Sequence, residues 1–256
     1  QTEKARSEDV VTEETVSEVS DVEKEKKAKE QQEKSSEDTM KKAETTADSN
    51  TAGAEKYRII RATQQQIEKK DGITVAVLDT GYDMTGSNTT GVMEGMDVSG
   101  SGSIQDVNGH GTQMANIIRE NLPEDAWVLP VRVTDNDGHA SSLKVYMGIM
   151  AAMEAGVDII SISMSSYRSA SSSLVTEAVE NAYDRGIAVV VAAGNYMSDT
   201  AEFVPANVEK AIVVSAVNSD GVFESYSNHG ATVDYSSYGT VETEGIGGES
   251  VSVSGT

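Results

Sequence analysis

The sequence predicts an α/β fold in which a parallel sheet carries helices on both faces, and three observations support it. Five segments of strand length are rich in valine and isoleucine and nearly free of polar residues, as expected for strands buried on both faces. Segments with helical periodicity alternate with them. The chain has 256 residues, 38% of them hydrophobic, enough to bury a sizeable core. The predicted strands are residues 73–79, 126–133, 157–162, 187–192 and 211–217.

The first predicted strand, residues 73–79, ends on an acidic residue. Asp79 is followed by Thr80 and Gly81. Active groups of open parallel sheets lie at the carboxyl ends of the strands, so Asp79 stands where a catalytic carboxylate would. An Asp-x-Gly sequence also forms ordinary turns, and that interpretation stays open.

The next feature is a histidine framed by glycines. Residues 108–112 read NGHGT and lead into a predicted buried helix, Gln113–Glu120. Glycine on each side frees the backbone around His110 and lets another segment approach closely. A single histidine is also often structural, so this residue type alone does not decide its role. His139 and His229 lie in polar, turn-like segments and are predicted to be exposed, and no group of His, Asp and Glu has the spacing of metal ligands.

Two further helices are predicted between the later strands, at residues 141–155 and 173–185. A serine can cap the start of the first helix, and Gly156 and Gly186 stand where glycine commonly ends a helix. The strand at 187–192 then leads into Ala193, Gly194 and Asn195. Asn195 can aim its amide N–H groups at the same sheet edge as Asp79, or it can form an Asx turn.

The chain divides near residue 57. Residues 1–56 contain no aromatic residue, are rich in Glu, Lys, Ser and Thr, and are predicted to be a disordered acidic segment. Residues 57–256 are predicted to be the folded domain. Residues 57–70 form either a short helix packed on that domain or the tail of a pro-segment. The C-terminal residues 247–256 are small and polar, and by themselves they indicate a loop.

Composition and charge exclude several classes of function. The net charge is −22, so the chain repels phosphates, and nucleic acid and anionic membranes are not expected partners. The longest apolar stretches are well under roughly 18 residues, so no membrane insertion is expected. The absence of cysteine excludes disulfides, thiolate metal sites and a cysteine nucleophile. No signal peptide is visible and the chain starts at Gln1, so either a signal was removed or this is part of a longer chain.

The order of these motifs resembles that of the subtilisin-like serine protease family, the subtilases. VAVLDTG resembles the Asp motif of the family, and NGHGTQMA resembles its His motif. VVVAAGN resembles the segment whose Asn completes the oxyanion hole, and SISMSS (161–166) resembles the strand that receives substrate. VSVSGT resembles the approach to a Gly-Thr-Ser motif. The resemblance covers roughly residues 57–256.

The resemblance implies a subtilisin-like fold and a serine endopeptidase. His110 would act as general base, Asp79 would orient it, and Asn195 would stabilise the oxyanion. The resemblance also implies substrate contacts from two short segments, one pairing with extended substrate and one lining the first specificity pocket. These residues are Ser163, Met164, Ser165, Ala193 and Gly194.

The resemblance also sets expectations for what is absent. The serine nucleophile is expected after Thr256, since Ser250, Ser252 and Ser254 all precede the Gly-Thr pair. The 256-residue chain alone is therefore expected to be inactive. Asn116 stands where the family commonly has glycine. No cofactor is expected to be required; calcium sites are frequent in the family, but no ligand set can be assigned here.

The expected partner is a peptide or protein substrate, the expected state a monomer, and the expected location secreted or at the cell surface. Two other functions stay open. One is a catalytically inactive pseudoprotease that binds peptides or partners. The other is an unrelated α/β binding domain, but neither a G-x-x-x-x-G-K-[ST] loop nor a strand-linked G-x-G-x-x-G motif supports it.

Overall fold

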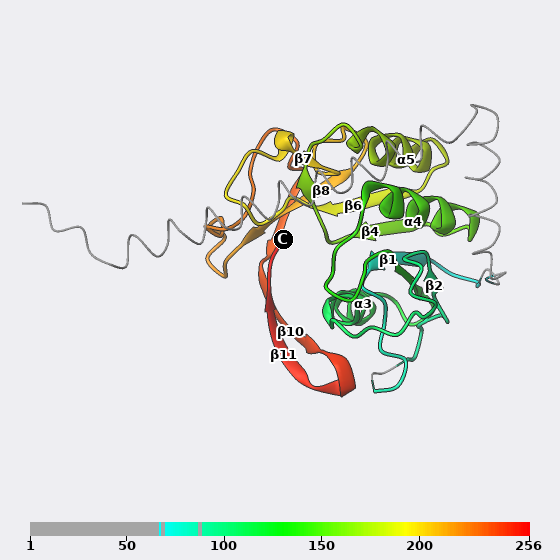
Figure 1. Ribbon diagram of the computed structural model, residues 1–256. Coiled ribbons are helices and arrows are strands. Elements are labelled where there is room, and N and C mark those ends of the chain that lie inside the picture. The colour runs from blue at the N-terminus through cyan, green and yellow to red at the C-terminus, as the bar shows by residue number, and fades with distance from the viewer. Residues whose placement is uncertain (1–66, 68–69, 87–88) are drawn as a thin grey trace, which may run out of the picture. The chain divides into compact units, whose positions relative to one another are not determined.

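The computed structural model describes residues 67, 70–86 and 89–256, and a seven-stranded sheet lies at its centre (Figure 1). The strand order is β2-β3-β1-β4-β6-β8-β9, and every neighbouring pair is parallel. The strands are β1 (Thr74–Asp79), β2 (Met96–Asp97), β3 (Trp127–Arg132), β4 (Ile159–Ile162), β6 (Ala188–Ala192), β8 (Ile212–Val217) and β9 (Tyr235–Tyr238). The five predicted strands are therefore confirmed. The predictions for residues 1–56 and the boundary at residue 57 lie outside the described residues.

Helices cover both faces of the sheet, as predicted, because side chains along each strand alternate between the two faces (Figure 1). Ala76 and Leu78 of β1 belong to the larger core, which includes buried side chains of α4 (Ser142–Glu154) and α5 (Ser172–Asp184). Val77 points to the opposite face and packs with Ala115 of α3 (His110–Glu120). The predicted serine cap is present: the Ser141 hydroxyl accepts a hydrogen bond from the N–H of Lys144 at 3.3 Å.

The prediction of a loop at the C-terminus was wrong. Residues Ser250–Ser254 form strand β11, which pairs with the antiparallel strand β10 (Thr240–Glu244). Its sequence alternates serine with valine, and the valines are half-buried while the serines are exposed. That alternation has the period of a strand, and pairing with β10, the strand that precedes it in the chain, satisfies its backbone hydrogen bonds.

Two short elements beside the sheet also escaped the sequence analysis. β5 (Ser166–Tyr167) pairs with the antiparallel β7 (Phe203–Val204), each only two residues long and too short to leave a periodic signal. No helix in the described part of the chain is long and apolar enough to span a bilayer.

Candidate active site

The structure brings Asp79 and His110 into contact, although 31 residues separate them. Asp79 is the last residue of β1 and is buried, and His110 is the first residue of α3. Nδ1 of His110 lies 2.8 Å from Oδ1 of Asp79. The N–H of Thr80 donates to the same oxygen at 2.7 Å and fixes the carboxylate. This leaves Nε2 as the nitrogen of His110 that faces away from the carboxylate.

The glycines around His110 allow this contact. The N–H of Gly111 donates to Oγ1 of Thr80 at 2.7 Å, so the start of α3 packs directly on the turn after β1. A Cβ at position 111 would come within 2.4 Å of the carbonyl oxygen of Gly81. Gly109, with φ of 104°, adopts a left-handed conformation that other residues rarely take.

Asp106 caps the helix that carries His110, and the sequence analysis missed it. Its Oδ1 accepts from the N–H groups of Asn108 and Gly109, both at 2.9 Å. Its Oδ2 accepts from the N–H of Thr112 at 3.0 Å and from the Thr112 hydroxyl at 2.8 Å. Burial alone raises the pKa of this carboxyl, but the hydrogen bonds outweigh burial and the pKa is lowered. The sequence did offer a signal for this cap, because Asp106 is an acidic residue just before the glycine-rich start of a predicted helix.

Replacing Asp106 by alanine is expected to lower the free energy of unfolding by about 1–2 kcal/mol, since the N–H of Thr112 in the first turn of α3 and the N–H groups of Asn108 and Gly109 just before it lose their acceptor. Because the folded pKa is lowered, this stabilisation is present above about pH 3.9 and is lost as pH falls below it. Urea unfolding between pH 3 and 7 measures both effects, with Asp220→Ala on the surface as the control. Equal stability of the two variants at pH 7 would show that Asp106 is no cap.

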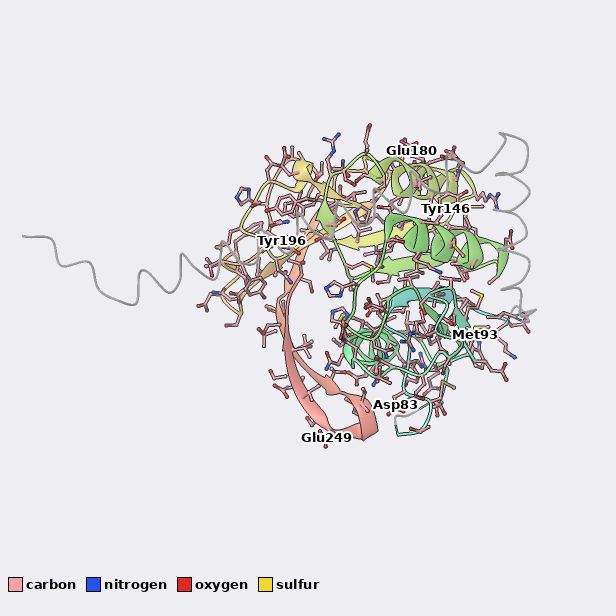
Figure 2. All side chains as sticks on the ribbon, in the orientation of Figure 1. Asp83, Met93, Tyr146, Glu180, Tyr196 and Glu249 are labelled. Atoms are coloured by element: carbon pink, nitrogen blue, oxygen red, sulfur yellow. The ribbon has the colours of Figure 1, made fainter. Side chains whose placement is uncertain are left out.

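Two buried polar side chains connect the β10–β11 hairpin to this region. Nδ2 of Asn116, on α3, donates to the carbonyl of Glu244 at 2.9 Å, which accounts for an asparagine at this position. Oδ2 of Asp83 accepts from the N–H of Gly247 at 2.8 Å, so Asp83 lies at the far end of the hairpin (Figure 2). Hydrogen bonds from Gln105 and Thr85 hold the pKa of Asp83 well below its usual range. The hairpin is thus fixed to the loops that present Asp79 and His110.

The electrostatics of the pair favour a charged imidazole. The hydrogen bond to Asp79 raises the pKa of His110, burial opposes it, and the negative charges of Asp79 and Asp106 add to the increase, so the pKa is raised overall. In the described part of the chain, Oδ2 of Asp79 is buried without a hydrogen-bond partner. The contacts of this carboxylate are therefore concentrated on the oxygen that faces His110.

Asn195, the last residue of the VVVAAGN motif, also lies at this edge of the sheet. Asn195 follows β6, and its Oδ1 accepts from the N–H of Thr256 at 3.1 Å. The N–H of Gly194 donates to the Thr256 hydroxyl at 3.0 Å. The carbonyl end of the Asn195 side chain is thereby occupied, and its Nδ2 has no hydrogen-bond partner among the described residues. The Asn195 side chain therefore does not form the Asx turn that the sequence left open as an alternative.

The predicted substrate segments lie side by side. Ser163, Met164 and Ser165 follow the end of β4 and pair with no strand in the described part of the chain. A Cβ on Gly194 would come within 2.7 Å of Oγ of Ser165, so the segment that contains Ala193 and Gly194 is in close contact with it. Met164 is half-buried and packs against the larger core.

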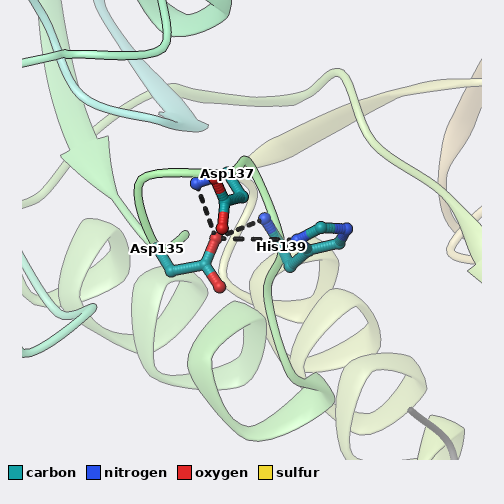
Figure 3. A group of neighbouring side chains, drawn as sticks. All are labelled: Asp135, Asp137 and His139. Carbon is teal, nitrogen blue, oxygen red and sulfur yellow. Dashed lines mark hydrogen bonds and ion pairs between the residues drawn. The ribbon is translucent and has the colours of Figure 1, made fainter. Parts of the chain in front are cut away.

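The other two histidines are exposed, as predicted. The sequence analysis overlooked a group that includes one of them: ligand atoms of Asp135, Asp137 and His139 lie within 4.8 Å of one another (Figure 3). Oδ1 of Asp135 accepts from the N–H groups of Asp137 at 3.0 Å and His139 at 2.9 Å. These are the bonds of a surface turn, and all three side chains are exposed. The turn accounts for the cluster without a metal ion.

Comparison with known proteins agrees with this arrangement. The family model described as "Subtilase family" matches residues 70–256. "Subtilisin-like protease 1" from Pseudogymnoascus destructans is 35% identical over 184 residues, which are 70% of this chain and 46% of the relative. "Extracellular serine proteinase" from a Thermus species is 38% identical over 168 residues, 64% of this chain and 41% of the relative. "Thermitase" from Thermoactinomyces vulgaris is 32% identical over 205 residues, 72% of each. The chain thus spans less than half the length of the first two relatives.

Solved structures show the same fold. A cold adapted subtilisin-like serine proteinase superposes with a TM-score of 0.65 and 24% identity, covering 77% of each chain. A lanthipeptide protease superposes with a TM-score of 0.66 and 21% identity, covering 78% of this chain and 75% of the other. At these identities the likeness concerns the fold alone.

Proposed function

This chain belongs to the subtilase family, and from that premise we propose that it supplies the aspartate and the histidine of the catalytic triad and the oxyanion donor of a serine endopeptidase. The observation that carries the proposal is the 2.8 Å contact between Asp79 and His110 at the edge of the sheet where Asn195 also lies. A buried carboxylate on Nδ1 of a histidine is the arrangement that makes Nε2 a general base.

The proposed roles follow from these positions. Asp79 holds the proton on Nδ1 of His110, so Nε2 is free to accept the proton of a serine hydroxyl and later to protonate the leaving amine. The positive charge that forms on the imidazole is stabilised by the adjacent carboxylate. Asn195, whose Nδ2 has no hydrogen-bond partner in the described part of the chain, donates to the oxyanion of the tetrahedral intermediate.

The proposed nucleophile is a serine directly after Thr256. The N–H and hydroxyl of Thr256 bind Asn195 and Gly194, so the following residue would stand beside the proposed oxyanion donor. The serines on β11 are less suitable, because they are committed to the hairpin with β10, and the Ser254 hydroxyl bonds to that of Thr240 at 2.8 Å.

The proposed substrate is a peptide or protein bound in extended form. The unpaired segment Ser163–Ser165 beyond β4 can receive an extended chain by strand addition. The acidic composition of residues 57–256, net −16, favours substrates with basic residues. Secretion and a monomeric state are part of the proposal; two relatives that support secretion are named as an extracellular serine proteinase and a minor extracellular protease.

The function is tested with the protein expressed from its complete reading frame. We expect it to hydrolyse an unstructured protein such as casein, and a serine-directed fluorophosphonate to abolish that hydrolysis. The polypeptide of residues 1–256 is the matched control and should neither hydrolyse casein nor be labelled. A complete protein that folds but neither cleaves nor reacts would contradict the proposal.

The raised pKa of His110 gives a further expectation. In the 1–256 polypeptide, NMR titration of the His110 ring should give a pKa above about 6.5, and Asp79→Asn should lower it, because the hydrogen bond to Asp79 is the largest cause of the increase. Only the neutral imidazole accepts a proton, so kcat/KM of the complete enzyme should fall as pH drops through the raised pKa. A His110 pKa below about 6.5 would mean that the carboxylate is not coupled to the ring in solution.

A further inference from the structure

The loop that carries Asn195 has an unusual backbone. Met197 has φ of 53°, and it is the one non-glycine residue in the left-handed region among those the structure describes. Gly194, on the other side of Asn195, has φ of 104°. Glycine takes a positive φ readily, but a left-handed conformation at a residue such as Met197 persists only where its surroundings hold it. The segment from Ala193 to Ser198 therefore needs an external support.

A single buried side chain, that of Asn228, supplies three hydrogen bonds of that support, and the N–H of Met197 adds one to the carbonyl of Tyr226 at 3.1 Å. Its Oδ1 accepts from the N–H of Tyr196 at 2.9 Å and from the N–H of Ser198 at 3.1 Å, the two residues that flank Met197. Its Nδ2 donates to the carbonyl of Ala193 at 2.9 Å. Three side-chain bonds from one residue thus hold the loop before and after Asn195; Tyr196 marks its place in Figure 2.

The backbone of Asn228 adds a fourth bond and is itself fixed to the sheet. Its N–H donates to the carbonyl of Gly194 at 2.7 Å. Ser227 connects it to β8, since Oγ of Ser227 accepts from the N–H of Ala216 at 3.1 Å and donates to the carbonyl of Asn228 at 3.0 Å. Asn228 is fully buried, so no water competes for these bonds.

The packing at Gly194 is tight. A Cβ on Gly194 would come within 2.5 Å of Nδ2 of Asn228, so the two residues are in direct contact only because position 194 is glycine. Asn195 in turn receives the N–H of Thr256 on its side-chain oxygen. Asn228 thus holds the backbone on both sides of Asn195, and Thr256 binds the oxygen of the Asn195 side chain. Together they fix the direction in which Nδ2 of Asn195 points.

We propose that Asn228 is a positioning residue that holds the Asn195 amide in the orientation that binds the oxyanion. The inference rests on the proposed function and names a residue that acts through Asn195 without touching the substrate. Loss of the Asn228 side chain removes the acceptor of the Tyr196 and Ser198 N–H groups and the donor to the carbonyl of Ala193, and so weakens the support of Met197 in its left-handed conformation. A displacement of about 1 Å at such a donor is enough to cost on the order of 10² in rate.

The test uses the enzyme expressed from its complete reading frame. Asn228→Ala is expected to lower kcat about 10- to 100-fold, while KM changes by less than about 3-fold, because the oxyanion forms only in the reaction. Asn218→Ala is the matched control: Oδ1 of Asn218 accepts from the N–H groups of Asp220 and Val222, both at 3.0 Å, in a different turn. That variant should keep its kcat.

A double-mutant cycle separates positioning from general stability. In the Asn195→Ala background, adding Asn228→Ala should cost less than about 3-fold, because the donor that Asn228 positions is already gone. Met197→Gly should restore part of the activity of Asn228→Ala, since glycine takes the left-handed conformation without strain. If Asn228→Ala does not fold, Asn228→Asp keeps the acceptor oxygen, loses the donor to Ala193, and should show the same coupling with a smaller loss.

The outcomes are distinct. An unchanged kcat in a folded Asn228 variant, or an equal loss with and without Asn195, would overturn the positioning role and leave the proposed function standing. A crystal structure of Asn228→Ala in which residues 193–198 keep their backbone would overturn it as well. If the unsubstituted complete enzyme cleaves no peptide bond, the proposed function itself fails and this role fails with it.

Discussion

His110→Ala in the complete enzyme is expected to lower kcat by about 10⁶, the size of loss known for the corresponding substitution in subtilisin itself. The physical reason is that no other described group can take the proton from a serine at this site. Asp79 is buried and already bonded to Nδ1 of His110, and the side chains of the other two histidines are exposed. KM should change little, because the imidazole acts on the reacting atoms.

His139→Ala and His229→Ala are the matched controls for this substitution. Both remove an exposed imidazole, and both should leave kcat within about 2-fold, as substitutions away from the reacting groups do. Steady-state kinetics with one peptide substrate measures all three variants. A His110→Ala enzyme that keeps more than about a hundredth of the activity would mean that another group is the base.

Asp79→Asn is expected to lower kcat by about 10⁴, a magnitude taken from the Asp-to-Asn substitution in another serine protease triad. The substitution keeps the size of the side chain but places an amide where Oδ1 now accepts from both Thr80 and His110. The neutral amide holds the proton on Nδ1 of His110 less strongly than the carboxylate does. The positive charge on the imidazole also loses its counter-charge.

The control for charge alone is Asp184→Asn, at the exposed C-terminal end of α5. It removes one negative charge at the surface and should leave kcat unchanged. Parallel measurement of the unfolding free energy shows whether Asp79→Asn remains folded. A loss of less than about 10-fold in a folded Asp79→Asn enzyme would show that the carboxylate has no part in orienting His110.

Much of the fold and of the candidate site could be predicted from local sequence, because the signals are local. Continuous Val/Ile segments identified the buried parallel strands, and the side chains that follow them had to meet at one edge of the sheet. That rule placed Asp79 at this edge, the resemblance to the subtilases paired it with His110, and the structure gives them a 2.8 Å contact. The catalytic roles of these residues stay predictions.

What the sequence did not reveal depends on contacts between distant segments. The β10–β11 hairpin is fixed by Asn116, which bonds to a carbonyl 128 residues away, and by Asp83, which bonds to an N–H 164 residues away. Asn228 likewise acts on residues about 30 positions earlier in the chain. An asparagine in a polar segment carries no periodic signal, so only the folded chain shows which backbone groups it serves.

The measurement that tests the central claim most directly is to map the residue that a fluorophosphonate modifies in the complete protein. Mass spectrometry of the labelled peptide identifies it, and the His110→Ala enzyme is the control that should label far more slowly. The account predicts a single modified serine directly after Thr256. Labelling of another residue, or none in a folded and unsubstituted protein, would contradict it.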